Sequence, residues 1–345
     1  MIKPYLIAEM GVNFYDTAKI LGIRPLEAAK LYIDKAKEAG INCAKFQSYK
    51  ARTIVSKNSP AYWDITKETT KTQYELFLKY DGFGKEEYKE LCDYTHAKGM
   101  DFTSTPFDYD SVDYLEDMVD FYKISSSDLS NLPFIQYIGM KGKPVYISVG
   151  ASYISEVDVA IRTLKEAGCK DIVVFHCVLS YPTEPKDANL RVIETLKKVF
   201  PDVRIGFSDH VAPDENMMTL ATAYLLGVEV IEKHFTLDKT LPGNDHYHAA
   251  EPEDFKKAIS NFKWIDTVLG SGEKTVLNCE IVSRREARRS LVLTRSLKLG
   301  ETIKPEDLMP KRPGTGISPE FYEIIVGRKV VRDLEEDTIL TWDMV

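Results

Sequence analysis

The chain has 345 residues, 44% of them hydrophobic and 28% charged, which is ordinary for a soluble globular protein with one large and one small domain. Its net charge of −8 excludes the basic surface typical of nucleic-acid-binding proteins. The five cysteines are widely spaced without a CxxC pair, which argues against a disulfide framework and fits a reducing cytoplasm. No apolar run resembles a signal-peptide core or reaches the roughly 18 residues of a membrane span, so we expect a cytoplasmic protein.

Short apolar runs rich in β-branched residues alternate with amphipathic stretches over the first 270 residues. We expect eight strands, which begin at Tyr5, Ile41, Met100, Val119, Pro144, Asp171, Val203 and Val228. The clearest helical patterns are Pro25–Ala39, Gly84–Lys98, Ile154–Ala167, Asn189–Val199, Glu215–Leu226 and Pro252–Leu269. Three of them end next to a glycine that supplies a left-handed cap, at Gly40, Gly99 and Gly168. This alternation predicts a parallel sheet covered by helices.

Eight strand–helix units in roughly 265 residues match a TIM (β/α)8 barrel. The alternative is a doubly wound open sheet, but no GxGxxG sequence follows the first strand. Residues 50–83 form the longest insertion and are rich in aromatic side chains, and we interpret them as a lid over the catalytic face. The barrel is expected to span residues 1–270, followed by a charged linker, residues 271–288, and a small, mostly β domain, residues 289–345.

Every predicted strand ends in polar or ionisable side chains. In chain order they are Glu9; Lys45 and Gln47; Ser104; Lys123, Ser126 and Asp128; Ser148; His176 and Tyr181; Ser208, Asp209 and His210; and Glu232, Lys233 and His234. A packed barrel interior does not need such groups, because buried ionisable side chains destabilise a fold unless they are paired. A structural polar network accounts for two or three of these positions, whereas all eight strands together indicate an active site.

His210 and His234 are 24 residues apart, about one strand–helix–strand step, so we expect them at the same height on adjacent strands. The spacing alone leaves two interpretations open, a shared divalent metal or a pair of hydrogen-bonded core histidines. With oxygen co-ligands, two imidazoles suit a first-row ion such as Mn, Co, Fe or Zn. His176 is a weaker third candidate, and His246 and His248 lie in a later loop where either could face a substrate.

Positive charges and hydroxyl groups converge on the same end of the predicted barrel. They belong to Lys45, Lys123, Ser126, Ser148 and Ser208. Together they predict an anion site for phosphate or carboxylate. The alternative for either lysine alone is an ion pair with Glu9 or Glu232, but this explains the whole set less well.

Specific sequence motifs run along nearly the whole chain in a fixed order. They are IAEMGVN (7–13), KFQS (45–48), STPF (104–107), YKIS (122–125), HC (176–177), YPT (181–183), GFSDH (206–210), EKHFTLD (232–238), PGND (242–245) and KRPGTGIS (311–318). This series resembles the N-acetylneuraminate (sialic acid) synthase family. GFSDH followed by EKHFTLD is highly specific, and KRPGTGIS marks the C-terminal antifreeze-like (SAF, β-clip) domain of that family.

The resemblance implies that phosphoenolpyruvate condenses with the aldehyde of an open-chain N-acylated amino sugar. The products would be a nine-carbon 2-keto-3-deoxy sugar acid and phosphate, made by a metal-dependent transferase that forms a carbon–carbon bond. His210 and His234 would be the metal ligands, for Mn²⁺ or alternatively Mg²⁺ or Co²⁺. Phosphoenolpyruvate would be held by Lys45, Lys123, Ser126, Ser148 and Ser208.

The resemblance also assigns the remaining roles. The catalytic groups would be Glu9, Lys45, Lys123 and Asp209, and the sugar would face Gln47, Asp128, Tyr181, Asp245 and Arg312. A domain-swapped homodimer is implied, in which Arg312 enters the barrel of the partner subunit. Glu9 would either act as a base or only position the sugar.

Four positions depart from the family pattern: Phe14, Asp128, Val149 and Leu179. They reflect either drift or a changed acceptor, such as the 2,4-diacetamido-trideoxyhexose of legionaminic or pseudaminic acid synthesis. A synthase for a phosphorylated aldose, as in octulosonate or heptulosonate formation, is disfavoured by the antifreeze-like unit. A non-catalytic carbohydrate- or ice-binding protein is disfavoured by the lysine, serine and histidine set.

Overall fold

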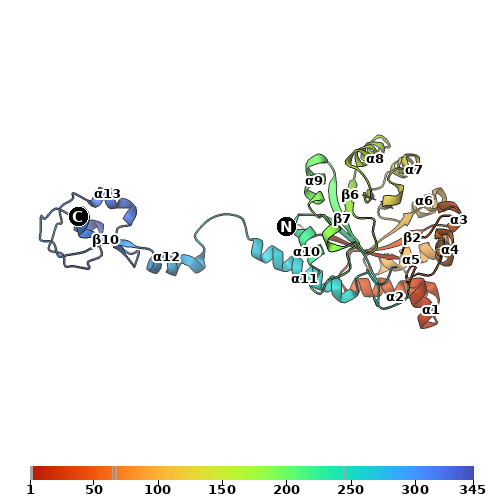
Figure 1. Cartoon of the computed structure of the whole chain (residues 1–345), viewed down its shortest axis with the longest axis horizontal. Coiled ribbons are helices and arrows are strands. Elements are labelled where there is room, and N and C mark those ends of the chain that lie inside the picture. The colour runs from red at the N-terminus through yellow and green to blue at the C-terminus, as the bar shows by residue number, and fades with distance from the viewer. Residues whose placement is uncertain (1–2, 64, 67, 244) are drawn as a thin grey trace. The chain divides into compact units, whose positions relative to one another are not determined.

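The computed structural model describes residues 3–63, 65–66, 68–243 and 245–345. The chain forms two compact units, Met1–Gly270 and Ser271–Val345 (Figure 1). Within the described residues, no helix has both the length and the apolar character needed to cross a membrane. Each unit has its own hydrophobic core.

Eight parallel strands form the centre of the first unit. They are β1 (Tyr5–Gly11), β2 (Cys43–Ser48), β3 (Asp101–Pro106), β4 (Tyr122–Ile124), β5 (Val145–Ser148), β6 (Ile172–Cys177), β7 (Arg204–Asp209) and β8 (Val230–His234). Their order is β3-β2-β1-β8-β7-β6-β5-β4. The remaining gap is bridged where the Asp120 amide donates to the Phe102 carbonyl at 3.0 Å. The predicted TIM barrel is therefore confirmed, as a nearly closed eight-stranded barrel.

Helices surround these strands (Figure 1). They are α1 (Phe14–Leu21), α2 (Pro25–Glu38), α3 (Ala51–Ile54), α4 (Gln73–Tyr80), α5 (Lys85–Ala97), α6 (Tyr109–Leu115), α7 (Leu132–Gly139), α8 (Ile154–Glu166), α9 (Val192–Val199), α10 (Met218–Leu225) and α11 (Pro252–Leu269). The cap glycines Gly40, Gly99 and Gly168 all have positive φ, as expected. The insertion at residues 50–83 carries α3 and α4, which lie in the loop region between β2 and α5.

The barrel interior is built in two layers of opposite character. The lower, apolar layer consists of Ile7, Cys43, Phe121, Tyr146, Val173, Phe175 and Val230. The upper, polar layer contains Glu9, Lys45, Lys123, Ser148, Cys177 and Glu232, all buried. Each polar residue follows an apolar one by two positions, in the same strand or, for Phe121, directly before β4, and side chains two apart point to the same side. The strand period therefore places the charged groups directly above an apolar floor.

Gly206 gives this floor the room that it needs. A Cβ atom at Gly206 would lie 2.8 Å from the Phe175 ring and 3.0 Å from the Val230 carbonyl oxygen. Real Cβ atoms do not approach so closely, so the absent side chain lets the Phe175 ring occupy the centre of the barrel. Two residues later the same strand presents the hydroxyl of Ser208.

The second unit is small and mostly irregular or extended. Its only two-stranded sheet in the described residues pairs β9 (Ser290–Leu293) with β10 (Leu308–Lys311) in antiparallel register. Single bridges add Val292 to Ile339, Leu297 to Leu334 and Thr302 to Lys329. Two short helices, α12 (Ile281–Ala287) and α13 (Tyr322–Ile325), complete it. The sequence prediction of a small, mostly β unit after the barrel agrees with this architecture.

Candidate active site

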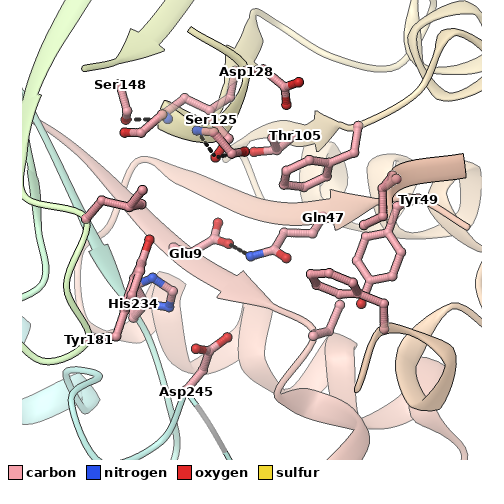
Figure 2. A pocket seen from close by; sticks show the side chains of 18 of the residues that line it. Glu9, Gln47, Tyr49, Thr105, Ser125, Asp128, Ser148, Tyr181, His234 and Asp245 are labelled. Atoms are coloured by element: carbon pink, nitrogen blue, oxygen red, sulfur yellow. Dashed lines mark hydrogen bonds between the residues drawn. The ribbon is translucent and has the colours of Figure 1, made fainter. Parts of the chain in front are cut away.

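A cavity of about 410 Å³ opens at the carboxyl ends of the barrel strands. Its lining includes Glu9, Lys45, Gln47, Lys123, Ser126, Asp128, Ser148, Tyr181, Ser208, His210, His234 and Asp245. Figure 2 shows Glu9 and Gln47 at its centre, with Ser148 and Asp128 on one side and Tyr181, His234 and Asp245 on the other. The structure thus gathers nearly all of the predicted site residues around one cavity, as the strand-end argument required.

Two lysines and two glutamates form a buried charge cluster at the base of this cavity. The ammonium of Lys45 forms an ion pair with Glu9 and lies 3.7 Å from Oε1 of Glu232. The ammonium of Lys123 lies 3.8 Å from the same Glu232 oxygen. The predicted alternative of lysine ion pairs with Glu9 or Glu232 is therefore present in the structure, and it coexists with the convergence of the two lysines. An anion that enters here meets both cations.

Burial and the neighbouring charges together set the pKa values of this cluster. It raises the pKa of Glu9 to about 7, although Lys45 opposes the shift. It lowers the pKa of Lys123. Burial also opposes the charged forms of Lys45 and Glu232, but the surrounding opposite charges prevail, so the pKa of Lys45 is raised and that of Glu232 is lowered. Glu9 is consequently the carboxyl group of the cluster that is best suited to exchange a proton near neutral pH.

The predicted hydroxyl groups are hydrogen-bonded around the lysines. Lys123 donates to Ser148 Oγ at 2.6 Å, and Ser208 Oγ donates to Glu232 at 3.1 Å. Ser126 Oγ accepts from the backbone amide of Gly150 at 2.9 Å, which fixes its position at the edge of the cavity. Lys45 also donates to Thr105 Oγ1 at 3.2 Å. These groups are preorganised to replace their mutual hydrogen bonds with bonds to a bound anion.

Three imidazole rings gather around Tyr181 on the opposite side of the cavity. The Tyr181 ring centroid lies 4.1 Å from that of His210, 5.9 Å from that of His234 and 5.6 Å from that of His248. The rings of His210 and His234 are 5.4 Å apart, so the two predicted histidines are neighbours. His210 Nδ1 lies 2.7 Å from the Val178 carbonyl oxygen, a contact that leaves Nε2 available to a ligand.

A group suited to a metal ion includes one of these histidines and two residues from a later loop. Ligand atoms of His234, Asp245 and His248 all lie within 4.8 Å of one another. Burial and the neighbouring imidazoles hold the pKa of His234 well below the usual histidine range, so the ring is neutral as a ligand must be. His234 Nδ1 is buried and has no hydrogen-bond partner among the described residues. A donor set of imidazoles and a carboxylate fits a first-row divalent ion.

Two predicted residues lie outside the cavity lining. Asp209 directly follows Ser208, and because alternate side chains of a strand face opposite ways, it points away from the cavity. Its carboxylate accepts a hydrogen bond from buried Lys233 at 2.7 Å. Asp209 thus holds Lys233 in place and does not line the cavity. Arg312 belongs to the second unit, Ser271–Val345.

The other histidines also have defined positions. His176, the weaker third candidate for a ligand, pairs through Nε2 with the Ala188 carbonyl oxygen at 2.8 Å and stacks on Phe207. His246 pairs through Nδ1 with Thr236 Oγ1 at 2.7 Å. The sequence did not single out His248 as a ligand, because its approach to His234 depends on the path of a loop with no periodic pattern. Glu232 was recognised as a strand-end residue and as an alternative partner for the lysines, without a role of its own in the site.

The insertion at residues 50–83 supplies much of the outer wall of the cavity. Tyr62, Trp63, Leu76, Phe77 and Tyr80 all line it. Because a loop between a strand and the following helix lies over the catalytic face, this position agrees with its interpretation as a cover for the site.

Two of the four departures from the family pattern line the cavity. Asp128 and Leu179 face it, whereas Phe14 packs against Tyr15 in the core and Val149 is buried away from it. A changed side chain at the first two positions alters the surface offered to a substrate directly, and one at the other two acts only through packing.

Comparisons with known proteins match both parts of the chain. A model of the NeuB family matches residues 32–274, and the SAF domain model matches residues 288–345. The chain belongs to the NeuB family. The C-terminal unit of this NeuB-family chain is the expected antifreeze-like domain.

Relatives of known name cover nearly the whole chain. The N,N'-diacetyllegionaminic acid synthase of Legionella pneumophila is 36% identical over 348 residues, which cover 99% of this chain and 94% of the relative. The N-acetylneuraminate-9-phosphate synthase of Homo sapiens is 30% identical over 344 residues, covering 99% and 92%. The crystal structure of an N-acetylneuraminic acid synthetase from Leptospira borgpetersenii in complex with citrate has a TM-score of 0.69 and 32% identity over 81% of this chain and 90% of that one.

Proposed function

We propose that this NeuB-family chain condenses phosphoenolpyruvate with an open-chain N-acylated amino sugar, giving a nine-carbon 2-keto-3-deoxy sugar acid and phosphate. The observation that carries the proposal is the lining of one cavity: two buried lysines ringed by hydroxyl groups share it with His234 and Asp245, which belong to a histidine–aspartate group. The first set suits a small, highly charged anion, and the second suits an ion that polarises a carbonyl group.

Lys45 and Lys123 bind the phosphate and carboxylate of phosphoenolpyruvate, with Ser126, Ser148 and Ser208 as further hydrogen-bonding partners. The negative charges of Glu9 and Glu232 offset both lysine charges in the free protein, so the empty cluster is nearly neutral. The bound anion then exchanges its water shell for fixed cations and hydroxyl groups, which orient C3 towards the acceptor.

The reaction begins when C3 of phosphoenolpyruvate attacks the aldehyde carbon of the sugar and forms the new carbon–carbon bond. Water then adds to the cationic C2 and gives up a proton, and the aldehyde oxygen takes up a proton. The C2–O bond to phosphate then breaks, phosphate leaves with the bonding electron pair, and the C2 hydroxyl loses its proton to give the ketone. Lys45 and Lys123 stabilise the departing phosphate.

Glu9 is the group that moves the protons. It lies between Lys45 and Gln47 and accepts a hydrogen bond from Gln47 Nε2 at 2.7 Å. With a pKa of about 7, its carboxylate accepts a proton from the water that adds to C2, and its acid form returns one to the aldehyde oxygen. Gln47 fixes the orientation of the carboxyl group in both states.

A divalent metal, which we expect to be Mn²⁺ with Mg²⁺ or Co²⁺ as alternatives, would be held by His210, His234 and Asp245. Its chemistry is that of a Lewis acid for the sugar aldehyde. Tyr181 packs against the imidazoles and keeps them at a fixed spacing.

The apolar part of the cavity wall favours a deoxygenated, doubly acetylated acceptor. Leu179 lines the cavity together with Trp63 and Phe77, and such side chains contact methyl groups better than hydroxyl groups. A 2,4-diacetamido-trideoxyhexose has these methyl groups, and its product would be a legionaminic- or pseudaminic-type acid. N-acetylmannosamine, which would give sialic acid, is the second candidate.

Arg312 completes the site from a second copy of the chain. It lies in the KRPGTGIS segment of the SAF domain, a unit distinct from the barrel. We assign it to the acceptor, in a homodimer whose SAF domains are exchanged between barrels.

The direct test is to incubate the purified protein with phosphoenolpyruvate, Mn²⁺ and a panel of N-acyl amino sugars that includes the diacetamido sugars. Equimolar release of phosphate and 2-keto acid is expected. The Lys123→Met variant, purified and assayed in the same way, should be almost inactive. If no sugar gives turnover, or if the variant is as active as the parent, the proposed function is wrong.

A further inference from the structure

His248 is a fully buried imidazole without a hydrogen-bond partner. Its side chain is 0% exposed, and neither ring nitrogen is bonded to any described residue. Buried polar atoms almost always have partners, since an unpaired donor or acceptor destabilises the fold. Two unpaired nitrogens on one buried ring therefore indicate a ligand.

The surroundings of His248 narrow the kind of ligand. Its ring centroid lies 4.8 Å from that of His234, and its Nε2 lies 3.9 Å from Asp245 Oδ1. His234 Nδ1 is also buried and unpaired in the described part of the chain. Two imidazoles and a carboxylate that approach one another without hydrogen bonds each offer a lone pair to the same small volume, and a single cation satisfies all three at once.

We propose that His248 is a further protein ligand of the metal centre, so that His210, His234, Asp245 and His248 together give three imidazole nitrogens and one carboxylate oxygen. The inference rests on the proposed function only for His210, since the group of His234, Asp245 and His248 is apparent from the geometry alone. It goes beyond the histidine pair that the sequence predicts.

A centre rich in nitrogen has a definite preference among metals. Mg²⁺ strongly favours oxygen ligands and retains its water, whereas imidazole suits first-row transition metal ions. Four protein ligands on a six-coordinate ion would leave two positions for substrate oxygens. The ligand set therefore selects Mn²⁺, Fe²⁺ or Co²⁺ over Mg²⁺ and assigns a specificity role to His248.

Metal binding without turnover tests this role. Protein stripped of metal is titrated with Co²⁺ and with Mg²⁺ by calorimetry, in the parent chain and in His248→Phe, which preserves an aromatic ring beside Tyr181 and Tyr247. We expect Co²⁺ to bind at least 10-fold more weakly to the variant, with a visible change in the Co²⁺ absorption spectrum. His96→Gln, a change on the surface at the hydrogen bond with Asp120, is the matched control and should bind as the parent does.

Pulsed electron paramagnetic resonance of the Mn²⁺-loaded parent protein gives a second measurement, and this one does not depend on whether the variant folds. Three directly coordinated imidazole nitrogens in the parent chain support the proposal, and the number should fall to two in His248→Phe. Two nitrogens in the parent, or an unchanged Co²⁺ affinity and spectrum in a folded variant, would overturn it. Turnover of the parent with phosphoenolpyruvate is scored separately, so that loss of this inference leaves the proposed function standing.

Discussion

Lys45 and Lys123 share one carboxylate oxygen, since Oε1 of Glu232 lies 3.7 Å from the first ammonium nitrogen and 3.8 Å from the second. Without this shared partner, two cations on nearby strands of a barrel interior would repel each other in a medium of low dielectric constant. Glu232 thus makes it possible to store two positive charges side by side before the substrate arrives. An anion that binds beside the two lysines then interacts with both positive charges.

Replacement of one of these cations should weaken the binding of phosphoenolpyruvate selectively. Because the Lys123 side chain is buried and supplies one of the two cations of the cluster, Lys123→Met should lower kcat/KM for phosphoenolpyruvate by roughly 10²–10³-fold. The KM for the sugar should change far less. Steady-state kinetics with each substrate varied in turn provide the measurement, and Lys35→Met, at an exposed pair with Glu38, is the control. An equal rise in KM for both substrates would contradict an anion-binding role.

The pH dependence should report Glu9. Its pKa is raised to about 7 by burial, so the carboxylate predominates above this pH and the acid form below it. A reaction that begins with Glu9 as a base should therefore lose kcat/KM as the pH falls through about 7. Glu9→Gln should have low activity, and its kcat/KM should no longer fall on the acidic limb of the pH profile. Glu253→Gln, on the surface, should keep the acidic limb of the parent. A limb that persists unchanged in Glu9→Gln would show that Glu9 only positions the sugar.

Leu179 should influence the choice of sugar. It lines the cavity, and an apolar side chain rejects hydroxyl groups while accepting methyl groups. Leu179→Asn should shift the ratio of kcat/KM values for N-acetylmannosamine and a diacetamido-trideoxyhexose by about 10-fold towards the former. Leu78→Asn, the same substitution at an exposed position of α4 outside the cavity lining, should leave the ratio unaltered. An unchanged ratio in Leu179→Asn would argue that the departure at this position is neutral.

Exchange of the SAF domains should be visible as complementation between two inactive variants. In a mixture of Lys123→Met and Arg312→Ala chains that have been unfolded and refolded together, each mixed dimer would contain one site with both residues intact. Random pairing should restore about a quarter of the parental activity. Variants that are mixed without refolding are the control. If refolded mixtures regain nothing, Arg312 acts on its own barrel or not at all.

The barrel and most of its site could be predicted because both depend on local periodicity. Strand spacing placed Lys45, Lys123 and Ser208 at strand ends, and the structure brings them to one cavity. The same periodicity should have excluded Asp209, which follows Ser208 and so faces the other way. His248 could not be assigned in this manner. Its position depends on a loop whose path is fixed by tertiary contacts, and no pattern of residue types encodes that path.

The alternation of an apolar floor and a charged layer has a consequence for how this enzyme tolerates change. A single-residue deletion in β2 before Lys45 would move every following side chain to the opposite side of the strand, and the ammonium group would enter the interface between sheet and helices. Insertions and deletions should therefore be confined to the loops, where they reshape the mouth and leave the charges in place. Loop variation can thus alter the outer part of the cavity, whereas the lysine–glutamate cluster, the proposed phosphoenolpyruvate site, is locked to the hydrogen-bond register of the sheet.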